Sequence, residues 1–194
     1  MAEFILASSS PRRRELLSLY GFPFLVIPGE VEEEGVTGTG RERVEKLALL
    51  KCEAVAVSHP KAFVLSADTL VCIGDQVLGK PGDARQAREM LLSLSGREHR
   101  VYTGVCLHTP SGELLRGVEE TRVRFLPLAE KWIDRYIATG EPFDKAGAYA
   151  IQGKAGIFVE GITGSPSNVI GLPLGLVTEF LEKAGVDFPA YPES

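Results

Sequence analysis

The start of the chain places a short apolar run directly before a serine-rich loop and the beginning of a helix. Residues 4–7 read Phe-Ile-Leu-Ala, three serines follow at positions 8–10, and Pro11 opens an amphipathic stretch. Ser10 suits a helix N-cap because its hydroxyl can accept a backbone N–H bond, and Pro11 suits the first helical position, which needs no N–H donor. The pattern therefore predicts a strand, a loop and a helix N-terminus in direct succession, an arrangement that can bind anions.

Three arginines occupy positions 12–14, in the first turn of this expected helix. A cation there opposes the helix dipole, at a cost of about 0.3–1 kcal/mol for each residue. The cost is offset if a multiply charged anion binds among the arginines. A solvated basic face or a nucleic-acid-binding patch would explain the same residues without such a ligand.

Length and charge limit the alternatives. A chain of 194 residues can bury one sizeable core, so we expect a single domain over residues 1–194, with room for two lobes around a central cleft. The formal net charge of -5 disfavours a general attraction to nucleic acid or acidic lipid. The basic cluster is therefore expected to act locally.

Cysteine usage and hydropathy indicate a cytoplasmic protein. Three cysteines, at positions 52, 72 and 106, form no C-x-x-C pair, which disfavours a disulfide framework and a zinc knuckle. The longest apolar stretch, residues 169–177, contains two glycines and a proline and is too short to span a bilayer. The first residues do not resemble a signal peptide. We expect neither a membrane nor nucleic acid as a partner.

Periodicity along the chain alternates between helix and strand. Capping boxes at residues 39–42 and 83–86 predict helices that run to about Val57 and Gly96. Further helices are expected over 129–138 and 174–183, and strands over 62–67, 70–73, 76–78, 99–108 and 113–125, with strand-like segments at 145–151 and 156–162. Because helices alternate with both single strands and hairpins, the pattern predicts an α/β fold with a mixed sheet flanked by helices.

Two charged residues interrupt apolar patterns. Lys51 stands at the centre of the apolar stripe of the first long helix, where a lysine either reaches past its neighbours to water or meets an anion such as phosphate. Asp68, followed by Thr69, interrupts an apolar strand, so we expect it at a strand end or bulge that opens into a cleft. A turn aspartate that accepts backbone N–H bonds is the alternative reading.

Weaker signals lie in two loops. Lys80 is held between Gly79 and Pro81, which restricts the backbone and can aim the lysine. The acidic triplet at 32–34 is typical of a solvated loop, and it becomes informative only if one of its carboxylates meets Asp68. Two carboxylates among cations are what a magnesium-dependent reaction on phosphate requires. The P-loop, dinucleotide-binding and G-x-S-x-G motifs are absent, and the histidines lack metal-ligand spacing.

Taken together and in order, these motifs resemble the Maf family. The resemblance covers nearly the whole chain and includes Ser8-x-Ser10-Pro11-Arg12-Arg13, Glu33, Lys51, Ala67-Asp68-Thr69, Gly79-Lys80-Pro81, Ser95-Gly96 with Thr103-Gly104-Val105, residues 144–153 and Gly171-Leu172-Pro173. It implies hydrolysis of a nucleoside triphosphate between the α- and β-phosphates, with a divalent cation, Mg²⁺, Mn²⁺ or Co²⁺. It also implies an elongated mixed sheet flanked by helices, related to the inosine triphosphate pyrophosphatases, and a homodimer.

The resemblance also implies roles for individual residues. The segment at 148–153 is similar to the branch that acts on dTTP and UTP, with CTP or modified pyrimidine nucleotides as further candidates, and differs from the branch that acts on 7-methyl-GTP. Asp68 is the implied catalytic residue and shares the metal with Glu33, or with a neighbour of Glu33 in the triplet. The implied substrate contacts are Ser8, Ser10, Arg12, Arg13, Lys51, Thr69, Lys80 and Gln152, of which Arg12, Thr69 and Gln152 fall at the positions associated with selectivity.

Two other functions remain open at this point. Maf proteins have been linked to inhibition of septum formation, so the chain could be a regulatory nucleotide-binding protein, although a pure binder has no need for two carboxylates. Binding of single-stranded nucleic acid through residues 12–14 is the other alternative, and the sequence lacks the interleaved aromatic residues that it would use.

Overall fold

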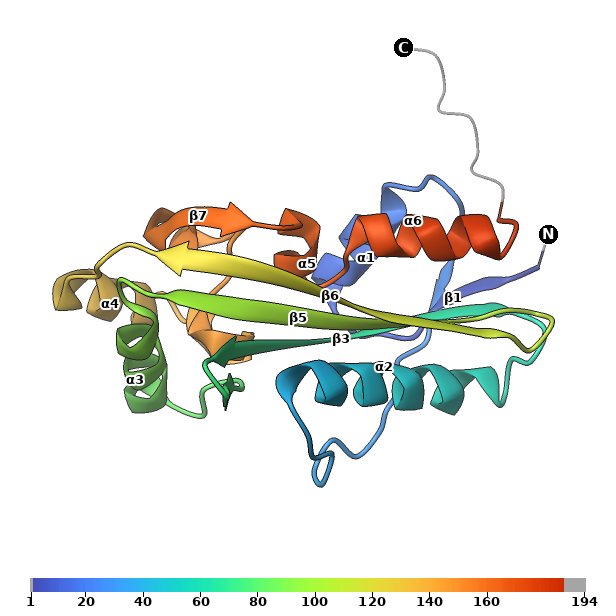
Figure 1. Cartoon of the computed structure of the whole chain (residues 1–194), viewed down its shortest axis with the longest axis horizontal. Coiled ribbons are helices and arrows are strands. Elements are labelled where there is room, and N and C mark those ends of the chain that lie inside the picture. Colours follow the sequence, from blue (N-terminus) through green and yellow to red (C-terminus); the bar gives the residue numbers. More distant parts are fainter. Residues whose placement is uncertain (1, 187–194) are drawn as a thin grey trace, which may run out of the picture. The chain divides into compact units, whose positions relative to one another are not determined.

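The computed structural model describes residues 2–186 and contains a mixed β-sheet with helices on its faces (Figure 1). Among these residues the sheet has seven strands in the order β2-β1-β3-β5-β6-β7, with β4 paired to β3. The strands are β1 (Phe4–Leu6), β2 (Leu25–Val26), β3 (Phe63–Ile73), β4 (Gln76–Leu78), β5 (Glu98–His108), β6 (Leu114–Phe125) and β7 (Val159–Thr163). Strand β1 is parallel to β2 and β3, whereas β4 is antiparallel to β3 and β7 to β6.

The helical elements alternate with these strands, as the sequence predicts. They are α1 (Pro11–Ser18), α2 (Gly40–Ala56), α3 (Ala84–Leu94), α4 (Glu130–Ile137), α5 (Pro166–Ile170), α6 (Leu174–Lys183) and the short 3-10 helices η1 (Glu141–Asp144), η2 (Ala146–Ala148) and η3 (Lys154–Phe158). The capping box of α2 is complete, since the hydroxyl of Thr39 accepts from Glu42 N and the Glu42 carboxylate accepts from Thr39 N. None of the helices in residues 2–186 is long and apolar enough to cross a membrane.

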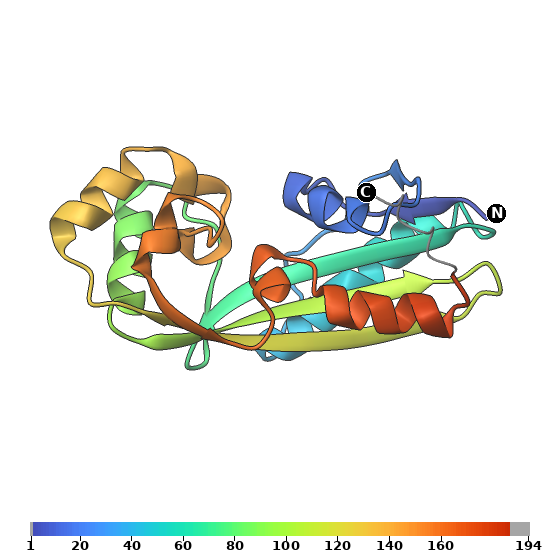
Figure 2. The ribbon, with the colours of Figure 1, turned by 90° about the horizontal axis from the view of Figure 1, so that it is seen from above.

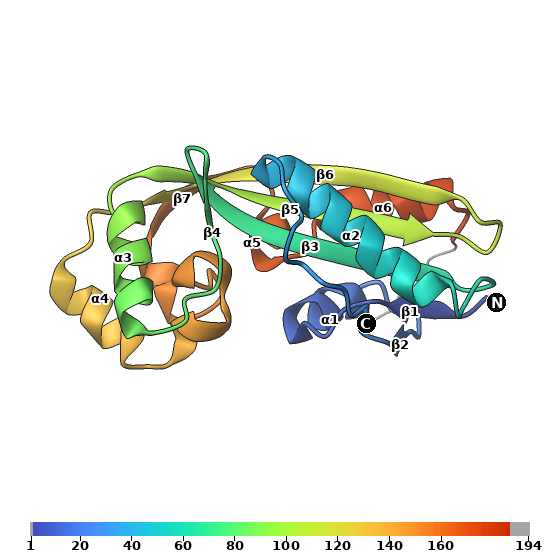
Figure 3. The ribbon, with the colours of Figure 1, turned by 90° about the horizontal axis from the view of Figure 1, so that it is seen from below.

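The chain divides into two compact units, and β3, β5 and β6 each contribute residues to both. Among the described residues, unit 1 comprises residues 2–68, 103–119 and 171–186, and unit 2 comprises residues 69–102 and 120–170. In unit 1, α2 covers one face of the strands, and α1 and α6 lie on the other face (Figures 2 and 3). The core between α2 and the sheet includes Ile5, Ala48, Cys52, Val64 and Cys106.

Unit 2 has a core of its own around aromatic side chains. Phe125 on β6 packs edge-on against Tyr149 and Phe158, and Tyr136 of α4 packs edge-on against Phe158. Helix α3 lies beside α4, to which Arg88 is linked by ion pairs with Glu130 and Asp134. Each unit therefore buries its own apolar side chains.

Three expectations about secondary structure are wrong. Residues 145–151 form the helix η2 and a turn rather than a strand, because Gly147 (φ 68°) and Ala148 (φ 61°) take left-handed conformations that a strand does not allow. Residues 154–158 form η3, so the strand expected over 156–162 begins only at Val159. Strand β3 also continues without a break through Asp68, which therefore lies inside a strand and not at its end.

Candidate active site

The serine loop after β1 caps helix α1 as the sequence predicts. Ser10 is the N-cap, and its hydroxyl accepts a hydrogen bond from the backbone N of Arg13 at 3.4 Å. Two residues earlier in the chain, the buried hydroxyl of Ser8 accepts a hydrogen bond from the backbone N of Ser10 at 3.2 Å. The two serines thus fix the loop so that the first turn of α1 follows directly from the end of β1.

Arg13 donates hydrogen bonds to two residues of unit 1 that are far apart in sequence. Its Nε donates to the carbonyl oxygen of Gly171 at 2.8 Å, and its Nη1 donates to the Ser8 hydroxyl at 3.2 Å. The pKa of Arg13 is lowered, mainly because the side chain is buried. The positive charge of Arg12 lowers the pKa further, whereas the negative charges of Asp68 and Glu33 partly offset the decrease. The charges of both predicted metal ligands therefore act on the Arg13 guanidinium.

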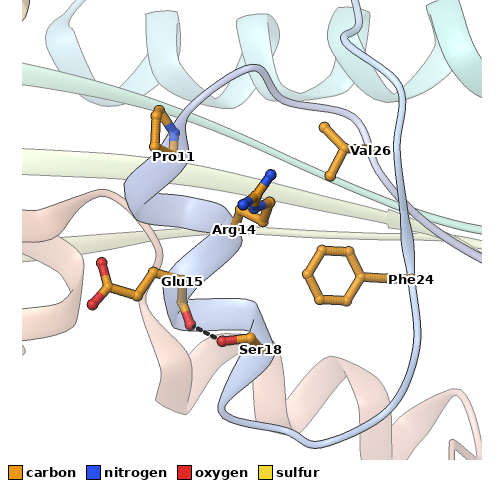
Figure 4. A pocket seen from close by; sticks show the side chains of 6 residues that line it. All are labelled: Pro11, Arg14, Glu15, Ser18, Phe24 and Val26. Atoms are coloured by element: carbon orange, nitrogen blue, oxygen red, sulfur yellow. Dashed lines mark hydrogen bonds between the residues drawn. The ribbon is translucent and has the colours of Figure 1, made fainter.

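Arg14 is separate from this group. It lines a pocket of about 670 Å³ together with Phe24 and Val26 (Figure 4). The lining residues do not include any residue that the sequence predicts to bind substrate.

Close backbone contacts fix the position of helix α2 against strand β5 and against the loop that precedes the helix. A Cβ on Gly29 would lie 2.3 Å from the carbonyl oxygen of Lys51, and a Cβ on Gly104 of β5 would lie 2.2 Å from that of Val44. In addition, the buried hydroxyl of Ser66 on β3 donates to the carbonyl oxygen of Ala48 at 2.6 Å. Glycine is required at both contacts, because any side chain would push the backbone of α2 away.

Lys51 joins the two predicted metal ligands. Its Nζ lies 2.6 Å from Asp68 Oδ1 and 2.6 Å from Glu33 Oε1. The side chains of Lys51 and Asp68 are largely buried, at 14% and 10% exposed, whereas Glu33 is 58% exposed. Lys51 therefore does not extend to water, and Glu33 is the member of the acidic triplet that meets it.

The position of Asp68 in β3 explains how a carboxylate is accommodated in a strand. Strand β1 pairs with β3 only as far as Leu65, so Asp68 lies three residues beyond the end of that pairing. The neighbouring ammonium of Lys51 supplies the opposite charge that a buried carboxylate needs. A strand end or a bulge is thus unnecessary.

The remaining predicted residues, Thr69, Lys80 and Gln152, belong to unit 2. Thr69 follows Asp68 in β3, and the exposed Lys80 lies two residues beyond β4. The last pair of the β3–β4 ladder is Val71 with Leu78, so Thr69 and Lys80 each lie two residues beyond it. Gln152 is exposed in a turn that is closed by a hydrogen bond from Gly153 N to Ala150 O at 3.0 Å.

Sequence reasoning assigned no role to two glycines that shape the site. Gly29 lets the loop that carries Glu33 touch the backbone of α2, and Gly171 provides the carbonyl that holds Arg13. Gly171 stands in one of the quoted motifs, and Gly29 stands in the Pro28-Gly29 pair before the acidic triplet. The residues around each glycine do not reveal its contact partner, because that partner is distant in sequence.

The match to a family model decides where this chain belongs. The model described as Maf-like protein matches residues 3–184. The chain belongs to the Maf family. This family assignment confirms the resemblance that the sequence motifs indicated.

Curated relatives match almost the full chain. The chain is 50% identical over 186 residues to the dTTP/UTP pyrophosphatase of Symbiobacterium thermophilum, covering 95% of each protein. It is also 50% identical over 186 residues to the dTTP/UTP pyrophosphatase of Myxococcus xanthus, covering 95% of this chain and 94% of the relative. The corresponding enzyme of Bacillus cytotoxicus is 49% identical over 184 residues, with 94% and 96% covered.

Solved structures with low sequence identity share the fold of this Maf protein. The Ham1 protein of Staphylococcus aureus superposes with a TM-score of 0.54 at 18% identity, covering 93% of this chain and 98% of that one. A HAM1 protein from Coxiella burnetii gives a TM-score of 0.51 at 15% identity, covering 94% and 100%. The predicted fold class, a mixed sheet flanked by helices, is confirmed.

Proposed function

We propose that this chain hydrolyses dTTP and UTP between the α- and β-phosphates and releases the nucleoside monophosphate and pyrophosphate. The observation that carries the proposal is the contact of Lys51 with both Asp68 and Glu33. Curated relatives at about half identity are named for this activity, and they match along nearly the full chain. CTP and modified pyrimidine nucleotides are further candidate substrates.

The serine–arginine turn suits the triphosphate. The backbone N–H groups at the start of an α-helix and the helix dipole attract anions, and Arg12 and Arg13 add positive charge at the same place. Ser8 and Gly171 hold the Arg13 guanidinium before substrate arrives, so less side-chain entropy is lost on binding. We assign phosphate binding to Ser8, Ser10, Arg12, Arg13 and Lys51, with Lys80 as a further predicted contact.

The carboxylates of Asp68 and Glu33 fit a divalent cation. Both approach one positively charged atom, Lys51 Nζ, at 2.6 Å, so they are close enough to share a cation. Mg²⁺ is commonly held by one or two carboxylates together with substrate phosphates and water, and Mn²⁺ accepts the same oxygen ligands. Mg²⁺, Mn²⁺ or Co²⁺, when bound, would neutralise phosphate charge and acidify a water molecule.

Asp68 is our candidate for positioning the nucleophile. A water molecule that donates a hydrogen bond to Asp68 is oriented for attack on the α-phosphorus, and the carboxylate can accept the proton that the water loses. The new bond joins the water oxygen to the α-phosphorus, and the bond to the bridging oxygen breaks, so pyrophosphate leaves. We assign to Lys51 and Arg13 the stabilisation of negative charge on the phosphates.

Base selection is assigned to Arg12, Thr69 and Gln152. A glutamine amide offers one acceptor and two donors, which suits the alternating groups on the edge of a uracil or thymine ring. A base that presents the wrong pattern leaves hydrogen-bonding groups unpaired in the complex and is disfavoured. We further propose that the enzyme works as a homodimer in the cytoplasm, and the molar mass measured by light scattering after gel filtration tests the dimer.

One substitution and one product measurement test the function. The purified protein is incubated with dTTP or UTP and Mg²⁺, Mn²⁺ or Co²⁺, and both pyrophosphate and orthophosphate are measured. We expect pyrophosphate, and we expect Asp68→Asn to lower kcat by about 100-fold or more. Orthophosphate as the first product would place the cleavage at the β–γ bond, and unchanged turnover in Asp68→Asn would overturn the catalytic assignment.

A further inference from the structure

The turn that carries Gln152 is short, exposed and fixed from both sides by buried or partly buried side chains. The hydrogen bond from Gly153 N to Ala150 O closes the turn and leaves Gln152 at its third position. A glutamine side chain has three rotatable bonds, so it can select a base only if its backbone is held in place. The residues on either side of the turn supply that support.

The first support is a buried pair of rings before the turn. The hydroxyl of Tyr149 lies 2.8 Å from Nε2 of His99, and the two residues are only 5% and 2% exposed. The ring of Phe125 packs edge-on against both, with centroid distances of 5.0 Å to His99 and 4.9 Å to Tyr149. Tyr149 is therefore fixed in position and direction three residues before Gln152.

This support acts on a stretch of backbone that would not hold its shape alone. Ala148 has φ 61°, a left-handed conformation that residues with a Cβ rarely adopt, and Gly147 before it has φ 68°. A backbone in this conformation persists only when its surroundings hold it. The Tyr149 anchor, directly after Ala148, meets that requirement, as does the hydrogen bond from Gly147 N to Gly79 O at 3.0 Å.

The second support is the carboxylate of Glu141, after the turn. Glu141 Oε2 accepts a hydrogen bond from the backbone N of Lys154 at 3.1 Å, and Oε1 accepts one from the Tyr136 hydroxyl at 3.1 Å. A Cβ on Gly153 would lie 2.1 Å from Glu141 Oε1, so the carboxylate occupies the space that a side chain would need. The Glu141 carboxylate thus lies directly against Gly153, the residue that follows Gln152.

We infer that Tyr149 with His99, and Glu141 with Tyr136, are positioning residues that set the base preference of the enzyme by presenting Gln152 in one orientation. The inference rests on the proposed function, in which Gln152 contacts the pyrimidine. These residues touch neither the phosphates nor the reacting atoms in that proposal. Their loss changes which bases are accepted, because a mobile glutamine can also meet the edge of a purine.

The test compares pyrimidine and purine nucleotides in two independent variants. Tyr149→Phe removes one hydroxyl and keeps the ring, and Glu141→Ala removes the carboxylate on the other side. In each, we expect the ratio of kcat/KM for UTP to kcat/KM for GTP to fall about tenfold, chiefly through a higher KM for UTP. Glu141→Gln, which keeps an acceptor and the volume, should recover most of the ratio.

Two controls separate this effect from simple destabilisation. Tyr20→Phe also removes a hydroxyl that is hydrogen-bonded, to the Leu174 carbonyl at 2.8 Å, but it lies in unit 1. It should leave the UTP/GTP ratio unchanged. A loss of folded protein lowers kcat for every nucleotide in proportion and does not alter the ratio either.

A double variant tests whether Tyr149 alters base preference through Gln152. If Tyr149 acts through Gln152, then adding Tyr149→Phe to Gln152→Ala leaves the base ratio of Gln152→Ala unchanged. If the wild-type protein releases pyrophosphate and Gln152→Ala alters the ratio while Tyr149→Phe and Glu141→Ala do not, the positioning role is refuted and the proposed function stands. If the wild-type protein releases no pyrophosphate from any nucleotide, the proposed function fails first.

Discussion

Lys51 of α2 and Asp68 of β3 form an ion pair with an N···O distance of 2.6 Å, and the same lysine nitrogen contacts Glu33. One ammonium group therefore balances two carboxylates in a partly buried place. A lysine in this position neutralises the acidic pair and also competes with any divalent cation for it.

Removal of the Lys51 charge separates these two effects. In Lys51→Met, we expect kcat/KM for dTTP to fall about 100-fold, because a cation that stabilises the phosphates is lost. We also expect Mn²⁺ to bind more tightly in the absence of nucleotide, because the two carboxylates no longer share an ammonium. Turnover assays and Mn²⁺ titration followed by electron paramagnetic resonance measure the two quantities. Lys46→Met on the exposed side of the same helix is the control, and equal effects in both variants would contradict the assignment.

Arg13 should not be replaceable by lysine. Its guanidinium donates to both Gly171 and Ser8, and the single ammonium of a lysine cannot reproduce this fork. We expect Arg13→Lys to raise the KM for dTTP about tenfold and to lower the unfolding free energy by about 1–2 kcal/mol. Arg14→Lys should change neither quantity by a comparable amount, because Arg14 lines a separate pocket. Steady-state kinetics and urea denaturation test both variants.

Gly29→Ala tests the close contact between the loop of Glu33 and helix α2. The added Cβ would meet the Lys51 carbonyl at 2.3 Å, so the loop or the helix must move, and we expect a loss of about 1–3 kcal/mol of unfolding free energy together with lower activity. Gly175→Ala in α6 is the matched control, since a Cβ there has no atom within 4 Å. It should raise the stability by about 0.4–1 kcal/mol. Equal stability of the two variants in urea denaturation would show that the close contact does not constrain the loop.

His99 should make the stability depend on pH below neutrality. Burial lowers the pKa of His99 from 6.5 to about 4, so the unfolded chain binds a proton at higher pH than the folded one. The corresponding stability is fully present above pH 6.5 and is lost as the pH falls towards 4, by about 3 kcal/mol in total. Carboxylates titrate in the same range, so the measured quantity is the difference between wild type and His99→Gln, obtained by denaturation at pH 4, 5, 6 and 7. A difference that is constant with pH would contradict this assignment.

The sequence predicts most of the secondary structure because the relevant signals are local. The capping box at Thr39 begins α2 within one residue of the expected position, and the strand expected over 76–78 is β4. The segment at 145–151 is predicted as a strand because its glycines and apolar residues resemble one, whereas in the structure two left-handed residues bend the backbone. Strand β2, only two residues long, carries too little pattern to be seen.

The candidate site could be predicted from the sequence only in part. Lys51 and Asp68 could be recognised because each breaks an apolar pattern, and the structure places them in contact. The contacts of Arg13 with Gly171, of Gly29 with α2 and of Tyr149 with His99 join residues that are far apart in sequence. Such contacts arise from tertiary packing, and they leave no periodic pattern in the local sequence.

The bond between Arg13 and Gly171 has a consequence for the order in which the enzyme is made. These residues are 158 positions apart, and Tyr20, close behind Arg13, donates to the Leu174 carbonyl across a similar span. The first turn of helix is synthesised early but lacks its support until residues 171–174 have left the ribosome. A nascent chain that stops before Gly171 lacks the carbonyl that holds the Arg13 guanidinium, so we expect Arg13 to become fixed only after residue 171 has emerged.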